Sequence, residues 1–120
     1  MRIAVSAQGK DLSSAVDPRF GRASYFLVYD TDDETVEVVD NGPNVQAAQG
    51  AGIQAAESIA RKNVELVVAG SFGPKAFQAL EAAGIKAARW THGTVAEAIE
   101  MARNYKLDIC HEANVEGHWA

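Results

Sequence analysis

Four consecutive apolar residues, Leu66–Ala69, constrain the fold more than any other feature of this 120-residue chain. An unbroken apolar run of this length predicts a strand that is covered on both faces, as in the parallel sheets of α/β proteins. Phe77 and Leu80 follow at helical spacing, and Gly84 can end that helix. The chain therefore contains a strand that leads into a helix, which is the repeating unit of an α/β sheet.

The same two patterns, strand and helix, recur on both sides of this unit. Alternating short side chains or runs of β-branched and aromatic residues indicate strands, and apolar residues at helical spacing indicate helices. Thr94 stands where it can cap the last helix. Strands are predicted at residues 2–7, 25–29, 36–39 and 85–90, and helices at residues 53–60 and 95–102.

The order of these elements predicts the class and topology of the fold. A short polar turn joins the second and third strands as an antiparallel hairpin. Right-handed crossovers place the last two strands beside the first one and parallel to it, with the hairpin on its other side. We therefore predict one α/β domain over residues 1–120, with a five-stranded mixed sheet and flanking helices. In such open sheets ligands bind at the carboxyl edge of the parallel strands.

Composition narrows the classes of function. The formal charge of −5 and the pI near 5.1 argue against a nucleic-acid partner, so any bound anion must be held locally. No apolar run approaches the roughly 20 residues that cross a bilayer, and residues 2–7 begin a strand in place of a secretory signal. The single cysteine, Cys110, suits a reducing compartment. We expect a cytoplasmic protein that contacts neither membrane nor nucleic acid.

Three glycine-containing loops at the predicted carboxyl edge run directly into helices. Helix starts offer unpaired N–H groups and a positive dipole end, and glycine allows close approach of a ligand. The same glycines can instead serve tight turns and helix packing, and none belongs to a nucleotide-binding fingerprint. The three stretches are Gln49-Gly50-Ala51-Gly52, Gly70-Ser71-Phe72-Gly73 and Thr91-His92-Gly93-Thr94.

The loop after the first strand contains the most informative segment, Asp17-Pro18-Arg19-Phe20-Gly21-Arg22-Ala23. Two arginines, an aromatic ring and a glycine are held there beside a proline. Arg19 and Arg22 can neutralise an anion, or they can be surface residues that pair with Asp17 and other acids.

Together with the strand before it, the hairpin after it and Asn41-Gly42-Pro43-Asn44, this segment resembles the dinitrogenase iron–molybdenum cofactor biosynthesis family. That family includes NifX, NafY, the C-terminal domain of NifB and the orange protein of sulfate reducers. The resemblance extends to about residue 102. It implies a ribonuclease H-like fold and a role in holding a molybdenum- or iron-containing sulfide cluster. We expect a molybdenum-containing cluster, of Mo–Cu–S or Fe–Mo–S type, that the edge residues hold noncovalently.

The predicted edge suits such cargo better than it suits a nuclease. These clusters are bulky, anionic and partly apolar, which fits backbone N–H groups, arginines and small side chains. A nuclease needs several carboxylates around Mg²⁺, and the edge offers mainly Asp11 and Asp17. The motifs also yield no catalytic triad or carboxylate pair. We therefore expect a carrier that is not an enzyme and that exchanges its cluster with donor or acceptor proteins; the alternative is a partner-binding regulatory module without metal.

Histidine and cysteine add possible metal ligands. His92 can ligate a metal or pair with an anionic cluster, or it can be an exposed residue of a helix cap. The C-terminal tail, residues 105–120, contains Cys110, His111 and His118. Their spacing is not that of a structural zinc site, and Cys110 can instead pack on the sheet as a small apolar residue. The sequence leaves the oligomeric state open.

Overall fold

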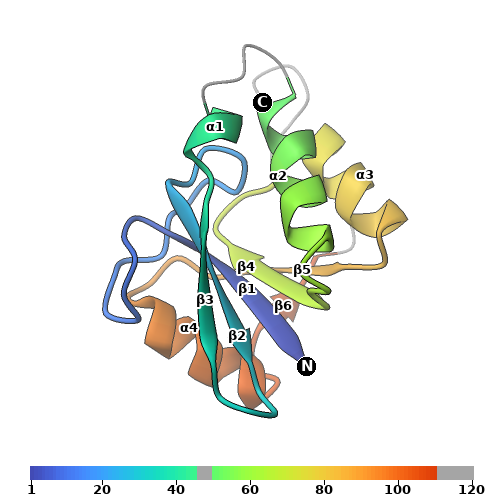
Figure 1. The fold of residues 1–120 in the computed structure, drawn as a ribbon. Helices are drawn as coiled ribbons and strands as arrows, with labels where there is room; N and C mark the ends of the chain where they lie inside the picture. Colours follow the sequence, from blue (N-terminus) through green and yellow to red (C-terminus); the bar gives the residue numbers. More distant parts are fainter. Residues whose placement is uncertain (46–49, 111–120) are drawn as a thin grey trace.

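The computed structural model describes residues 1–45 and 50–110. Their strands form one mixed sheet in the order β3-β2-β1-β4-β5-β6 (Figure 1). Strands β1, β4 and β5 are parallel, β2 and β3 form an antiparallel hairpin beside β1, and β6 is antiparallel to β5. The strands are β1 (Arg2–Ala7), β2 (Tyr25–Asp30), β3 (Val36–Asp40), β4 (Leu66–Ala69), β5 (Lys86–Arg89) and β6 (Asp108–Ile109). The α/β class and the predicted order of the first five strands are confirmed.

The predicted number of strands was wrong, because the described residues form six strands and not five. The additional strand, β6, lies in the segment that we assigned to the tail. It has two exposed residues, too few for any alternation of side chains to mark it in the sequence. Backbone hydrogen bonding holds it in place, with Ile109 opposite Ala88 and the Cys110 N–H donating to the Ala87 carbonyl at 2.7 Å.

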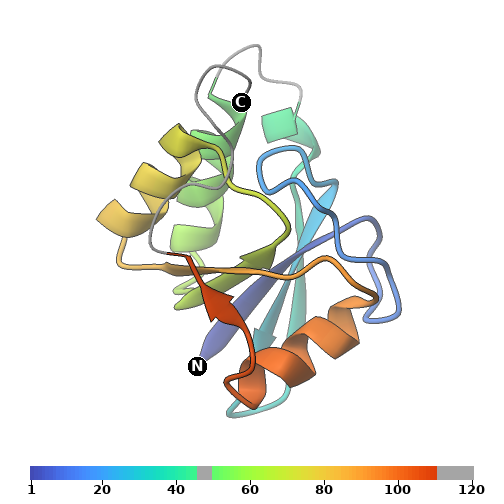
Figure 2. The same cartoon turned by 180° about the vertical axis from the view of Figure 1, so that it is seen from behind.

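Helices cover both faces of the sheet, as the apolar run of β4 predicts. Helices α2 (Ala51–Ala60) and α3 (Pro74–Ala82) lie on one face, and α4 (Val95–Arg103) lies on the other (Figures 1 and 2). All four residues of β4 are buried between them. The sequence did not predict α1 (Gly42–Val45), a single turn after β3. The ribonuclease H-like assignment stays a prediction.

Each face of the sheet has its own core. Val67 and Phe26 belong to the core under α2 and α3, and Val68 and Leu27 belong to the core under α4. Adjacent residues of one strand therefore face opposite helices, as the pleat requires. Within the described ranges, no helix has the length and apolar character needed to cross a bilayer.

Helix α4 begins and packs as its sequence predicts. Thr94 and Glu97 form a reciprocal capping box at its start. The buried residues of the helix lie on the predicted face and are Val95, Ala98, Ile99 and Ala102.

The long loop after β1 crosses the carboxyl ends of the parallel strands. The Phe20 N–H donates to the Ser71 carbonyl at 3.1 Å, and the Val16 N–H donates to the Gly93 carbonyl at 3.0 Å. These bonds join the loop to the segments that follow β4 and β5. The loops therefore meet at one edge of the sheet, which is the predicted location of the site.

Candidate functional site

The segment Asp17–Ala23 lies directly on the first turn of α2. A Cβ atom built on Gly21 would lie 2.9 Å from the Gly52 Cα. A Cβ atom on Gly52 would in turn lie 2.8 Å from the Ala76 Cβ in α3. Both glycines are therefore required for close packing of the loop, α2 and α3, which is the structural role that the sequence left as an alternative.

Phe20 anchors this segment in the core. Its side chain is 1% exposed, and its ring centroid lies 5.2 Å from that of Phe26 and 5.4 Å from that of Phe72. A buried ring has no surface to offer to a bulky ligand. Phe20 instead fixes the backbone between the two arginines.

Arg19 and Arg22 lie on the exposed side of the same segment. The Arg19 side chain is 66% exposed, and its Nε lies 3.9 Å from the Asp17 Oδ1, while its backbone N–H donates to the same oxygen at 2.9 Å. The Arg22 side chain is exposed, and its Nη1 donates to the Val45 carbonyl at 2.9 Å. The predicted pairing of Arg19 with Asp17 exists but is long. Each guanidinium has five N–H donors, so both keep donors for a ligand beyond these contacts.

The start of α2 lies beside these arginines and is built from small residues. Gly50 is its N-cap in a left-handed conformation with φ of 76°, and among the described residues no side chain caps the helix. Among the described residues, no atom lies within 4 Å of a Cβ built on Gly50, and Ala51 is 7% exposed. In this part of the chain, the positive end of the α2 dipole therefore faces the edge without a capping carboxylate.

The segment Gly70-Ser71-Phe72-Gly73 holds the loop after β1. The Ser71 Oγ donates to the Pro18 carbonyl at 3.0 Å, and a Cβ on Gly70 would clash with Pro18 and Thr91. Gly73 is the N-cap of α3, and Pro74 at the first helical position has no N–H to donate. These residues contribute more to the shape of the edge than to its hydrogen-bond donors.

The backbone N–H groups at the start of α4 already have hydrogen-bond partners within the protein. The Thr94 N–H donates to the Glu97 Oε1 at 3.0 Å, and the Glu97 N–H donates to the Thr94 Oγ1 at 3.2 Å. The N–H groups of Val95 and Ala96 donate to carbonyls of the loop after β1 at 2.9 Å. Four backbone donors are thus occupied, and a carboxylate already lies at the positive end of the dipole.

His92 and Gly93 precede this capped start and are both exposed. Gly93 has a φ of 114°, and its carbonyl accepts the hydrogen bond from Val16. His92 can therefore contribute its side chain to the edge, whereas the backbone of this turn joins α4 to the loop after β1.

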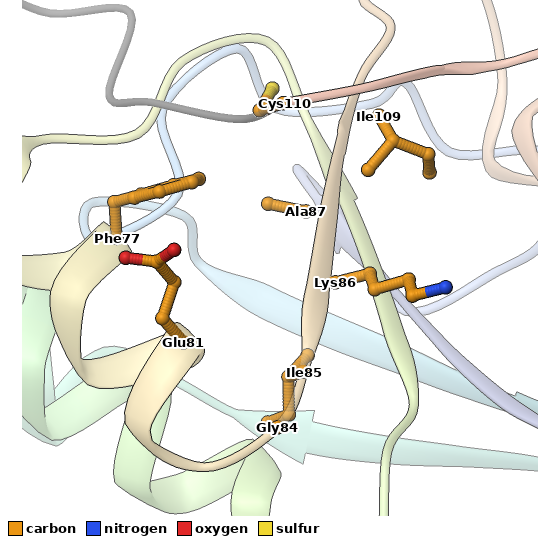
Figure 3. A pocket seen from close by; sticks show the side chains of 8 residues that line it. All are labelled: Phe77, Glu81, Gly84, Ile85, Lys86, Ala87, Ile109 and Cys110. Atoms are coloured by element: carbon orange, nitrogen blue, oxygen red, sulfur yellow. The ribbon is translucent and has the colours of Figure 1, made fainter.

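Cys110 lies apart from these residues. It is half-buried against the core under α2 and α3, and burial raises the pKa of its thiol. It lines a groove of about 580 Å³ with Phe77, Glu81 and Ile109, beside the amino-terminal half of β5 (Figure 3). His111 and His118 lie outside the described residues. Within the part of the chain that is described, no three His, Cys, Asp or Glu side chains are grouped as metal ligands.

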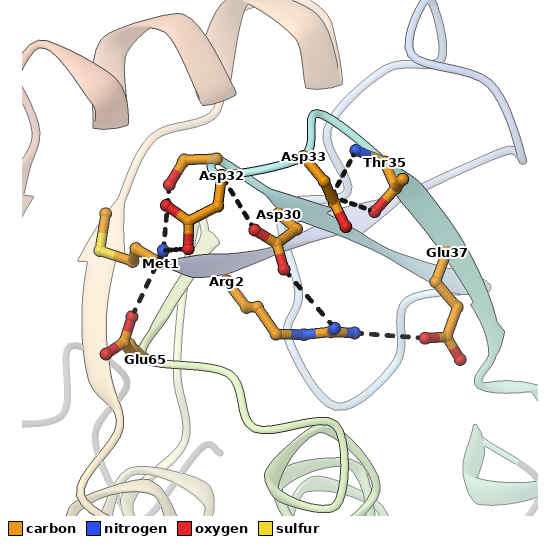
Figure 4. A network of polar contacts seen from close by, with 9 residues as sticks. Met1, Arg2, Asp30, Asp32, Asp33, Thr35, Glu37 and Glu65 are labelled. Atoms are coloured by element: carbon orange, nitrogen blue, oxygen red, sulfur yellow. Dashed lines mark hydrogen bonds and ion pairs between the residues drawn. The ribbon is translucent and has the colours of Figure 1, made fainter.

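The acidic charge gathers at the opposite end of the sheet. Asp30, the last residue of β2, and Asp32 and Asp33 in the turn that follows lie beside the Met1 amine and Arg2 at the start of β1 (Figure 4). Hydrogen bonds from Thr35 hold the pKa of Asp33 below its usual value, and a hydrogen bond from Lys62 does the same for Glu37. This cluster of acids therefore lies at the opposite end of the sheet from Arg19 and Arg22, and Met1, Arg2 and Lys62 pair with it.

Sequence reasoning did not predict that two buried polar side chains, those of Ser6 and Asn41, secure the loop. The Ser6 Oγ donates to the Asp17 carbonyl at 2.7 Å and lies 3.2 Å from the Val68 carbonyl. The Asn41 Nδ2 donates to the Ala23 carbonyl at 2.7 Å. Their partners lie 11 or more residues away, so no local pattern indicates them.

A model of one protein family matches most of the chain. The family model described as dinitrogenase iron-molybdenum cofactor matches residues 1–105. A search of curated proteins found no match.

Several solved structures share the fold. The apo form of the orange protein from Desulfovibrio gigas has 42% sequence identity and a TM-score of 0.92, over 95% of this chain and 96% of that chain. A Thermotoga protein proposed to be a NifB has 42% identity and a TM-score of 0.85, over 97% and 98% of the two chains. A proposed dinitrogenase from Methanocaldococcus jannaschii, at 18% identity and a TM-score of 0.70 over 93% and 96%, shares the fold alone.

Proposed function

Because the chain belongs to the dinitrogenase iron-molybdenum cofactor family, we propose that it binds and carries a preformed molybdenum-containing sulfide cluster. The cargo rests at the carboxyl edge of the sheet and is held noncovalently. The observation that carries this proposal is the position of Arg19 and Arg22, two exposed cations on a loop that packs on the start of α2, which no described side chain caps.

The residues at this edge fit a bulky anion in three ways. The two guanidinium groups supply charge-assisted hydrogen bonds to sulfide or oxide ligands. The start of α2 adds the positive end of its dipole, and no described atom lies within 4 Å of the position of a Cβ on Gly50. Phe20, Ser71 and the Gly21–Gly52 contact keep the loop in place, so the backbone that carries both cations is fixed before the cargo arrives.

Both cluster types remain in the proposal. The orange protein and the Thermotoga protein have the same 42% identity to this chain, so sequence identity does not choose between Mo–Cu–S and Fe–Mo–S cargo. Transfer to or from a donor or acceptor protein in the cytoplasm completes the proposal. Catalysis is not part of it, because the described residues of the edge do not pair a nucleophile with a base.

The test is the affinity for tetrathiomolybdate, with and without copper(I), followed by its visible absorption. The double variant Arg19→Ala/Arg22→Ala should bind roughly tenfold or more weakly, because charged hydrogen bonds are lost from an anion site. The control Arg61→Ala/Lys106→Ala removes the same two charges from exposed positions outside the site and should bind like the unaltered protein. Equal affinity in all three proteins would refute the proposed site.

A stable complex with a partner protein in the absence of any metal would instead favour a regulatory module. The described edge holds two exposed cations with partly unused donors, which favours the carrier.

A further inference from the structure

Asn41 is a fully buried amide at the point where β3, the loop and α1 meet. Its side chain is 0% exposed, and its Nδ2 donates to two carbonyls, that of Gly21 at 3.3 Å and that of Ala23 at 2.7 Å. These are the residues on either side of Arg22. One side-chain amide therefore holds the backbone carbonyls of both residues that flank this arginine.

The other atoms of Asn41 connect the same point to α1 and α2. Its Oδ1 accepts from the Asn44 Nδ2 at 2.9 Å, and Asn44 also donates to the Ser58 Oγ of α2 at 3.1 Å. The Asn41 backbone carbonyl accepts from the N–H groups of Asn44 and Val45 at 3.0 Å. The amide thus uses both donors and its acceptor, and a chain of side-chain hydrogen bonds runs from the loop to α2.

The far end of the Arg22 side chain depends on the same residue. The Arg22 Nη1 donates to the Val45 carbonyl, and Val45 is the last residue of α1, the turn that starts on the Asn41 carbonyl. Asn41 therefore fixes the backbone of Arg22 and also the acceptor of its guanidinium. Arg19, in contrast, is oriented by Asp17 and has no contact with this network among the described residues.

We propose that Asn41 is the positioning residue that aims Arg22 at the anionic cargo, an inference that rests on the proposed function. An exposed arginine loses side-chain freedom when it binds an anion, and this loss weakens binding. A guanidinium that is already oriented loses less, so the network raises affinity without touching the cargo. Asparagine suits the position because it supplies two donors and one acceptor without a charge.

The test is a double-mutant cycle on tetrathiomolybdate affinity. Asn41→Leu keeps the approximate shape and the neutrality of the side chain but removes its hydrogen bonds. It should weaken binding by roughly threefold to tenfold in the unaltered protein and should have no further effect in an Arg22→Ala background. Asn104→Leu, which removes an exposed amide outside the site, is the matched control and should leave affinity unchanged.

A spectroscopic readout separates aiming from general stability. In the free protein, the NMR signals of the Arg22 side-chain N–H groups should move in Asn41→Leu, while those of Arg19 should stay in place. If Asn41→Leu does not fold, Asn44→Ala is used in its place, because it removes the donor to the Asn41 Oδ1. It should lower the affinity for tetrathiomolybdate by less than Asn41→Leu, and it should have no effect in the Arg22→Ala background. Full affinity in these variants, or a loss that persists in the Arg22→Ala background, would overturn the inference.

The cycle also distinguishes the two proposals. If Arg22→Ala itself binds as well as the unaltered protein, the proposed site fails. If Arg22→Ala weakens binding and Asn41→Leu does not, only the role of Asn41 fails.

Discussion

Replacement of Gly21 by alanine should separate the loop from α2. The added methyl group would lie 2.9 Å from the Gly52 Cα and 3.0 Å from the Gly52 N. Both are backbone atoms in the first turn of α2, so no side-chain rotation relieves the contact. The loop must therefore move away from the helix, and Arg22 moves with it.

The cost follows from the nature of this contact. One extra methyl group in well-packed surroundings destabilises a protein by about 1–3 kcal/mol. For a domain of this size that corresponds to a fall in Tm of roughly 3–12 °C. Affinity for the anionic cargo should fall as well, because the cations move relative to the start of α2.

Thermal unfolding by circular dichroism and binding of tetrathiomolybdate measure the two effects. Gly9→Ala is the matched control in the same loop, because its methyl group would meet only the side chain of Ser14. That side chain can rotate, so the loss should be smaller. Equal Tm values and affinities for Gly21→Ala and the unaltered protein would show that the loop does not depend on close packing against α2.

Three other outcomes follow from the capping box, the ion pairs and the buried thiol. Thr94→Ala should lower stability by about 0.5–2 kcal/mol in denaturant unfolding without weakening cargo binding, and a loss of binding would contradict the assignment of this turn to structure. The hydrogen bond from Lys62 holds the folded pKa of Glu37 below its unfolded value. This pairing therefore stabilises the protein at pH values above the unfolded pKa, and the stabilisation is lost as the pH falls through the folded pKa. Glu37→Gln should therefore flatten the acid limb of the stability profile, and an unchanged limb would refute the pairing. Because burial raises the pKa of the Cys110 thiol, iodoacetamide should modify it more slowly at neutral pH than it modifies glutathione, as followed by mass spectrometry; an equal rate would contradict its burial.

Much of the fold could be predicted because its elements have strong local patterns. The apolar run of β4 marks a strand that is buried on both faces, and the helical spacing of apolar residues in α4 marks a helix that is buried on one face. The handedness of crossovers then orders the strands without any knowledge of side-chain contacts. Strand β6 escaped prediction because two exposed residues carry no pattern, and its position depends on backbone pairing with β5.

The position of the candidate segments at the carboxyl edge could be predicted from the sequence, but their contacts could not. The sequence placed the segment with Arg19 and Arg22 at the carboxyl edge, but it could not show that Phe20 between them points into the core. It also predicted a helix start after His92 without showing that a distant loop occupies the N–H groups there. Such long-range contacts, like those of Asn41, are decided by the tertiary fold.

Elemental analysis and visible absorption of the protein, purified without oxygen from its native host, would show whether it carries a cluster. We expect molybdenum and sulfide in a fixed ratio to protein, accompanied by copper or iron, and a coloured sample. A colourless, metal-free native protein that also fails to take up tetrathiomolybdate would contradict the carrier role and would favour a partner-binding module.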